Sequence, residues 1–223
     1  MDNNTIKPTA KLEQMQQEVI ETHNKIKMLC EGNEKLKNVY KGCLIYSSPI
    51  YKNPNILFFG INPNGKYDFV EKDMFEPLKI DRKGYGVFWK EIKDCLESID
   101  KKELSKNMVL TNRYFLATHT ADELDNFFNL LKDDHNEIAK KQEEWTRTLI
   151  NELSPKLIIA GGKRIWDKFN KLFPNNTEIL EKGKSTKVLK INGIVLIIYM
   201  RNHNSIRDKE EFIKFLRKYT NEL

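Results

Sequence analysis

The chain has 223 residues, of which 39% are hydrophobic and 31% charged, so it carries enough apolar material for one buried core and is not disordered throughout. Its net charge of +6 is mild, and its three widely spaced cysteines exclude a disulfide framework and a four-cysteine metal or iron–sulfur site. The longest aliphatic run is too short to span a bilayer, and we expect no secretory signal. These features predict a reduced, cytoplasmic protein without a metal or another cofactor.

The N-terminal segment is predicted to be helical from Ala10 to about Tyr40, with a break near Gly32. Its apolar residues recur at helical spacings and form one stripe, made of Leu12, Met15, Val19, Ile26 and Leu29. Such a stripe is typical of a helix packed on its own domain, with a coiled-coil arm as the alternative. We therefore divide the chain into an N-terminal helical extension, residues 1–45, and an α/β domain, residues 46–223.

Four short apolar runs follow, and helical stretches alternate with them. The runs cover residues 56–59, 108–110, 157–160 and 195–198, and the helical stretches cover residues 87–99, 136–153, 164–172 and 210–219. Unbroken apolar runs are typical of strands buried on both faces, and Asn192-Gly193 predicts a hairpin that joins residues 188–191 to the last strand. The alternation predicts a three-layer α/β/α sandwich with a mainly parallel four-stranded central sheet, plus the N-terminal helices.

Polar residues follow each of the four predicted strands, at the edge where parallel sheets place their ligands. The segments are Gly60-Ile61-Asn62-Pro63, Thr111-Asn112-Arg113, Gly161-Gly162-Lys163 and Arg201-Asn202-His203-Asn204-Ser205-Ile206-Arg207. Each also has an ordinary explanation, such as turn formation, capping or close helix–strand packing. Together they predict a polar site at one edge of the sheet. An excess of basic residues between positions 181 and 218 favours a polyanionic partner such as nucleic acid.

These segments resemble, in the same order, motifs of the uracil-DNA glycosylase superfamily. Gly60-Ile61-Asn62-Pro63 is similar to the first motif of the mismatch-specific and single-strand-selective branches. Phe88-Trp89-Lys90 resembles the segment that opens the next helix in the mismatch-specific branch, and His203-Asn204-Ser205 is similar to the family's second motif, H-P-S. The resemblance covers about residues 50–220 and leaves the first 45 or so outside.

The resemblance implies a monofunctional DNA glycosylase that flips uracil or a related deaminated base out of the stack and hydrolyses its N-glycosidic bond. Asn62 would orient the attacking water, and His203 would donate a hydrogen bond to the departing uracil. Asn112 would pair with the edge of the base, and Phe75 or Tyr85 would stack on its face. The residues that would contact DNA are Gly162, Lys163, Arg201, Ser205 and Arg207, with Arg207 as the wedge that fills the gap in the stack.

Two other functions stay open at this point. A catalytically silent nucleic-acid-binding protein of the same fold is one, because Asn64 and Asn204 stand where the family has Gly and Pro. An interaction module that uses the N-terminal helices is the other, because of their apolar stripe. For the glycosylase we expect damaged DNA as the partner, no membrane association, and a monomer. We expect no metal site, and we expect His23 and His135 to be solvated.

Overall fold

The computed structural model describes residues 8–63, 86–162, 165, 169, 172–202, 205–221 and 223, and the side chains of residues 86–89 and 202 lie outside this description. The main sheet consists of β2 (Ile56–Gly60), β3 (Met108–Asn112), β5 (Leu157–Gly161), β6 (Thr177–Lys182), β7 (Thr186–Ile191) and β8 (Ile194–Tyr199). The helices are α1 (Ala10–Glu31), α2 (Glu34–Val39), α3 (Gly86–Glu97), α4 (Glu123–Leu130), α5 (His135–Leu153) and α7 (Lys209–Thr220), with short 3-10 helices at Lys102–Ser105 and Lys132–Asp134.

The sheet has the strand order β3-β2-β5-β8-β7-β6, with six strands where the apolar runs predict four. The first four strands in this order run parallel, and they are the four predicted from the sequence. The predicted hairpin is confirmed, because β7 pairs antiparallel with β8 through a turn in which Asn192 and Gly193 both have positive φ. β6 has no apolar run because this edge strand has no buried side chain.

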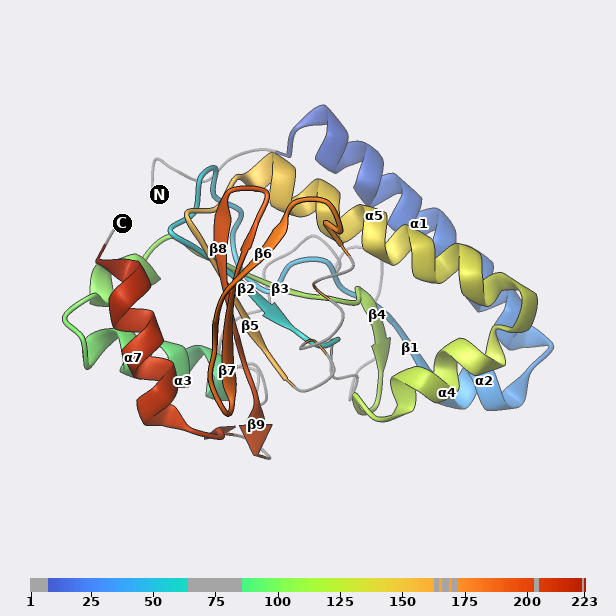
Figure 1. The fold of residues 1–223 in the computed structure, drawn as a ribbon. Helices are drawn as coiled ribbons and strands as arrows, with labels where there is room; N and C mark the ends of the chain where they lie inside the picture. Colours follow the sequence, from blue (N-terminus) through green and yellow to red (C-terminus); the bar gives the residue numbers. More distant parts are fainter. Residues whose placement is uncertain are drawn as a thin grey trace.

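Helices cover both faces of the sheet (Figure 1). On one face, α1 and α5 share a core with Leu57 and Phe59 of β2. On the other face, α3 and α7 share a core with Ile56 and Phe58. Because side chains alternate between the faces of a strand, a strand covered on both sides must be apolar at every position, and this is why β2 is an unbroken apolar run.

The N-terminal segment packs against the rest of the chain, as its apolar stripe predicts. α1 lies beside α5, and the indole nitrogen of Trp145 in α5 donates a hydrogen bond to the Glu18 carboxylate in α1 at 3.0 Å (Figure 1). After α2, the strand β1 (Tyr40–Cys43) pairs antiparallel with β4 (Leu116–Thr118) in a second, two-stranded sheet. The division of the chain at residue 45 stays a prediction.

The prediction that His23 is solvated was wrong, because only 4% of this residue is exposed. His23 lies one helical turn after Val19 and therefore belongs to the buried face of α1. Its Nδ1 atom lies 2.7 Å from the hydroxyl of Tyr40, and burial raises the pKa of that hydroxyl.

No helix among the described residues combines the length and the apolar character that crossing a bilayer requires.

A carboxylate ties α7 to the loop between β6 and β7. Glu211 accepts hydrogen bonds from the backbone nitrogens of Lys184 at 2.8 Å and Ser185 at 2.9 Å, and from the Ser185 hydroxyl at 3.0 Å. Burial raises the pKa of Glu211, but these bonds outweigh it, so the net shift of the pKa is downward. The ionised carboxylate therefore stabilises the folded state.

Replacing Glu211 by Gln is expected to lower the free energy of unfolding by about 2 kcal/mol at pH 7, because hydrogen bonds to a charged acceptor are lost. Since the pKa of Glu211 is lower in the folded state, this stabilisation is complete above the unfolded pKa of about 4.3 and disappears as the pH falls through the folded pKa. Urea unfolding at a series of pH values from 7 towards 3 should show the difference between variant and wild type shrinking. Glu210→Gln, at an exposed neighbour, is the matched control, and equal effects of the two substitutions would contradict this role.

Candidate active site

The carboxyl ends of the four parallel strands meet at one edge of the sheet. The register places Gly60 of β2 beside Asn112 of β3, and Gly161 of β5 beside Tyr199 of β8. The chain leaves β2 to form β3 on one side, and it later returns to form β5 on the other side. The topological switch point therefore lies between β2 and β5, where open parallel sheets hold their ligands.

The structure brings several of the predicted site residues to this edge. Asn62, Asn112 and Gly162 follow or end β2, β3 and β5. Three further predicted residues, Arg201, Ser205 and Arg207, lie on or directly after a small hairpin of two strands, β9 (Arg201–Asn202) and β10 (Ser205–Ile206), which follows β8. The predicted residues that lie outside the described part of the chain are Phe75, Tyr85, Lys163 and His203.

The side chain of Asn62 is held in one orientation by Thr118. Its Nδ2 atom donates a hydrogen bond of 2.9 Å to the hydroxyl oxygen of Thr118, and a second of 3.3 Å to the carbonyl of Pro63. The Thr118 hydroxyl in turn donates its proton to the carbonyl of Thr120 at 2.6 Å, so towards Asn62 it can act only as an acceptor. This fixes which end of the amide faces Thr118. The Oδ1 atom of the half-buried Asn62 is left without a protein donor among the described residues.

Asn112 lies against the backbone of Gly60, and only 2% of it is exposed. A Cβ atom added to Gly60 would lie 2.5 Å from Oδ1 of Asn112, a distance that real Cβ atoms do not reach. The pairing of the two strands continues past their ends, because the backbone nitrogens of Arg113 and Tyr114 donate to the carbonyls of Gly60 and Ile61 at 2.8 and 2.9 Å. Position 60 is therefore a glycine because a larger residue would collide with the side chain of Asn112.

The glycine pair after β5 allows a second close approach at the switch point. A Cβ atom on Gly161 would collide with the ring of Tyr199, and one on Gly162 would lie 2.8 Å from the side chain of Ile61. Gly162 also has φ +128°, a conformation that residues with a side chain rarely adopt. Gly161 thus lets Tyr199 of β8 approach β5, and Gly162 lets the loop after β2 touch the end of β5. Both are close packing contacts, although neither is the helix–strand packing that the sequence suggested.

The β9–β10 hairpin presents polar and basic side chains. Ser205 and Arg207 are exposed, while Arg201 is half-buried. Burial lowers the pKa of the Arg201 guanidinium, and the neighbouring Tyr199 and Glu91 oppose that shift. The backbone nitrogen of Arg207 donates to the carbonyl of Met200 at 3.0 Å, which closes the base of the hairpin.

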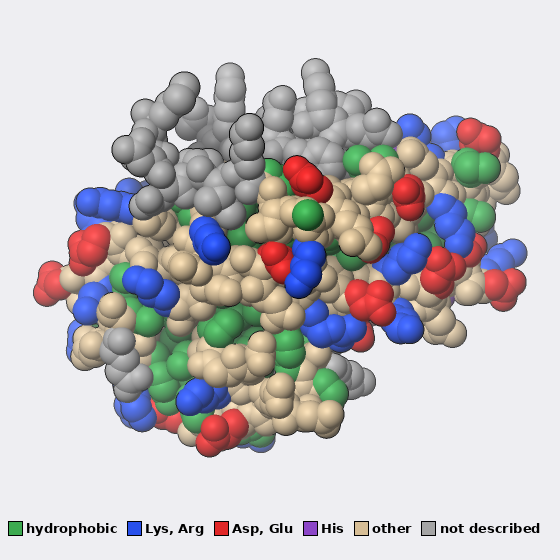
Figure 2. Space-filling view, turned by 90° about the horizontal axis from the view of Figure 1, so that it is seen from above, with side chains coloured by type: hydrophobic (Ala, Val, Ile, Leu, Met, Phe, Trp, Pro, Cys, Tyr) green, Lys and Arg blue, Asp and Glu red, His purple; other side chains and the backbone are tan. Residues whose placement is uncertain are grey.

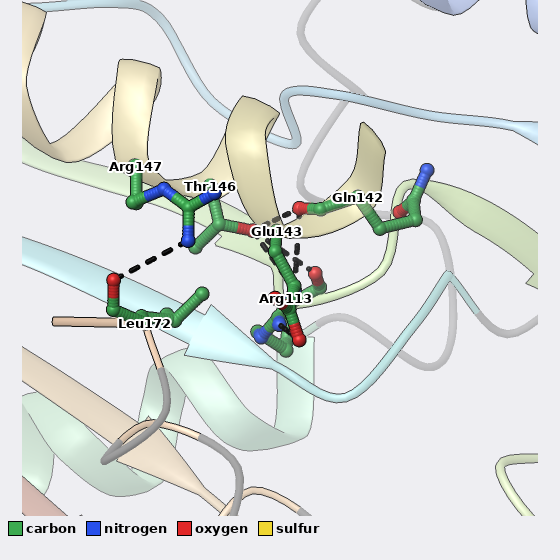
Figure 3. Close-up of polar contacts among 6 residues, drawn as sticks. All are labelled: Arg113, Gln142, Glu143, Thr146, Arg147 and Leu172. Carbon is green, nitrogen blue, oxygen red and sulfur yellow. Dashed lines mark hydrogen bonds and ion pairs between the residues drawn. The ribbon is translucent and has the colours of Figure 1, made fainter. Parts of the chain in front are cut away.

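Arg113, which the sequence analysis placed in a polar segment without giving it a role, is buried directly after β3. Arg113 is 1% exposed, and its Nη1 atom donates to the carbonyl of Gln142 at 3.2 Å and to the hydroxyl of Thr146 at 3.1 Å (Figure 3). The nearest carboxylate oxygen, on Glu143, lies 3.9 Å from Nη2, and burial lowers the pKa of the guanidinium. A basic residue directly after a predicted strand that ends in Asn112 was the available signal.

Arg113 also borders a pocket of about 380 Å³ on the side of α4 and α5. Aromatic side chains line it, Tyr114 and Phe128 among them, and the ring of His135 lies against Phe128 with 5.3 Å between ring centroids. His135 is therefore partly covered and not fully solvated. Arg113 therefore links the loop after β3 to α5 through its hydrogen bonds to Gln142 and Thr146.

Figure 2 shows basic and acidic side chains interspersed over the described part of one face of the molecule. The net charge of +6 is therefore not gathered into one basic patch on that face. The charge on that face therefore gives no support for a polyanionic ligand. Within the described residues, no group of three or more His, Cys, Asp and Glu side chains is placed to hold a metal ion.

Comparison with protein families and with curated proteins found no match for this chain.

Replacing Gly60 by Ala is expected to displace Asn112 and to lower the free energy of unfolding by about 1–3 kcal/mol, the usual effect of overpacking. In an Asn112→Ala background the same substitution should cost less, because the colliding oxygen is gone. A double-mutant cycle followed by urea unfolding measures this coupling. Gly32→Ala is the control, since a Cβ there meets nothing within 4 Å. Strict additivity of the Gly60 and Asn112 substitutions would contradict the contact.

Proposed function

We propose that this chain is a monofunctional DNA glycosylase of the uracil-DNA glycosylase superfamily, which removes uracil or a related deaminated base from DNA. The observation that carries the proposal is the pair of amides at the switch point of the sheet. Asn62 has its orientation fixed by Thr118, and no described residue donates to its Oδ1 atom. Asn112 lies one strand away against Gly60. This pair follows the motif order on which the family resemblance rests.

The chemistry that Asn62 can support is dissociative hydrolysis. An amide oxygen accepts a hydrogen bond from water, but it is too weak a base to remove a proton before attack. The bond between C1′ and the base would therefore break first, and its electron pair would leave with the base. Water held at Oδ1 would then add to the electron-poor C1′ and release its proton, while the departed base takes up a proton. Positioning of this water supplies most of the effect of Asn62.

The remaining residues of the edge fit the recognition of a flipped base in DNA. Asn112 offers a donor and an acceptor on one planar group. Uracil and cytosine differ in the donors and acceptors along the base edge, so such a group would distinguish them. Ser205, Arg201 and Arg207 would contact the DNA backbone, with Arg207 as the wedge. His203 would donate to the leaving uracil, by the resemblance of its motif.

Replacing Asn62 by Ala is expected to slow base release by about 100- to 1,000-fold, the usual cost of removing one positioned polar group, while DNA binding persists. Thr118→Val removes only the hydroxyl that orients the amide and should cost about tenfold. The assay uses end-labelled oligonucleotides with one uracil, either single-stranded or opposite G or A, and alkali to cleave the abasic product.

Asn126→Ala, an exposed amide on α4, is the matched control and should leave base release unchanged. If the wild-type protein releases no base from any of these substrates but binds them in a salt-dependent manner, the glycosylase proposal fails and a silent nucleic-acid-binding protein takes its place. Base release that is unchanged in the Asn62 variant would remove Asn62 from the mechanism.

Replacing Arg207 by Ala is expected to weaken base release from duplex DNA more than from single strands, because only a duplex leaves a gap for a wedge to fill. Arg217→Ala, on the exposed side of α7, removes the same charge elsewhere and serves as the control. Rates measured on both substrates at one salt concentration give the comparison. Equal losses on the two substrates would exclude the wedge role.

A further inference from the structure

A side chain of α3, that of Glu91, holds the β9–β10 hairpin by a hydrogen bond. The backbone nitrogen of Ile206 donates a hydrogen bond to Oε1 of Glu91 at 2.7 Å. Ile206 itself is buried in the core that α3 and α7 share. Ile206 pairs with Arg201 across the hairpin, so Glu91 binds the strand β10, and Arg201 lies opposite in β9.

The second oxygen of this carboxylate takes no part in the attachment. Oε2 of Glu91 is buried and has no hydrogen-bond partner among the described residues, which is costly for a charged group. A neutral amide oxygen in the same place would also accept from Ile206, although more weakly than a carboxylate. Burial lowers the pKa of the half-buried Arg201, and Tyr199 and Glu91 oppose that shift.

The other attachments of the hairpin come from the opposite side. Met200 donates its backbone N–H to the carbonyl of Ser185 at 2.7 Å, and Arg207 donates to Met200. Neither bond reaches α3, the helix that lies between β2 and β3 in the chain. The bond to Glu91 thus links the hairpin after β8 to the helix that crosses between β2 and β3, the strands on whose carboxyl ends the two amides of the candidate active site lie.

We propose that Glu91 is a positioning residue, whose carboxylate fixes the β9–β10 hairpin against α3 and so places Arg201 and Ser205 relative to Asn62 and Asn112. Its consequence for catalysis rests on the proposed glycosylase function, whereas the attachment itself does not. Removing the carboxylate changes no residue of the candidate active site itself, but it lets the hairpin shift. Small shifts of a positioned group reduce the rate of the chemical step.

The test compares Glu91→Ala, which removes both oxygens, with Glu91→Gln, which keeps an acceptor for Ile206. Amide hydrogen exchange followed by NMR reports the attachment directly. In Glu91→Ala the amide of Ile206 is expected to exchange at least about tenfold faster, with the amides of β2 and β5 unchanged, as in a local opening. In Glu91→Gln its protection should return.

Kinetics on the uracil oligonucleotide supply the second measurement. Glu91→Ala should lower kcat by about tenfold or more while KM changes less than about threefold, the pattern of a group that acts on the transition state. Glu91→Gln should recover kcat to within about threefold. Glu97→Ala is the matched control on the same helix, because its carboxylate lies in an exposed ion pair with Lys102, and it should alter neither measurement.

Unchanged protection of Ile206 in Glu91→Ala would overturn the attachment. Protection that returns in Glu91→Gln while kcat stays as low as in Glu91→Ala would overturn positioning through this hydrogen bond. Absence of base release by the wild-type protein would remove the catalytic role together with the proposed function, and the exchange at Ile206 would still decide whether Glu91 holds the hairpin.

Discussion

The close approach of β2 and β3 at their carboxyl ends is the constraint on which the candidate active site depends. A side chain at position 60 would push Asn112 away, and only glycine leaves room for that amide against the backbone. The two hydrogen bonds from Arg113 and Tyr114 then keep the strands together beyond the sheet proper. Because Asn62 follows directly, its backbone is fixed by the same pairing. The two amides are therefore held at a set separation before any ligand arrives.

The other half of the site is held by two carboxylates in addition to backbone pairing. Glu211 binds the loop at Ser185, Ser185 accepts from Met200 at the base of the hairpin, and Glu91 holds the far arm at Ile206. Partly buried carboxylates are costly unless hydrogen bonds compensate them. Glu91 binds the short hairpin itself, whereas Glu211 binds the loop that accepts the hydrogen bond from Met200 at the base of the hairpin. Side chains from α3 and α7 therefore contribute to holding this part of the edge.

The parts of the fold that the sequence predicts are those determined by local pattern. The four parallel strands, the hairpin at Asn192-Gly193 and the buried face of α1 each follow from spacing of apolar residues or from turn chemistry. The orientation of Asn62 could not be predicted, because it depends on Thr118 in the three-residue strand β4, which is too short to carry a pattern.

The same holds for Glu91 and Arg113. Each looks like a solvent-facing polar residue in the sequence, and each owes its role to a partner far away in the chain, 115 residues away for Glu91 and Ile206. The edge of the sheet where polar residues gather follows from the sequence. The contacts that aim those residues do not, since they are long-range and involve single side chains.

The N-terminal segment takes part in this arrangement. Tyr40 of β1 is the register partner of Thr118 in β4, and the hydroxyl of Tyr40 lies against His23 of α1. The threonine that orients Asn62 is thus held from the N-terminal side, by a segment outside the family resemblance. Because the apolar stripe of α1 is already covered by the rest of the chain, that stripe no longer argues for a partner protein. The physical role that these contacts support is a frame for β4, which holds the Thr118 hydroxyl against the amide of Asn62.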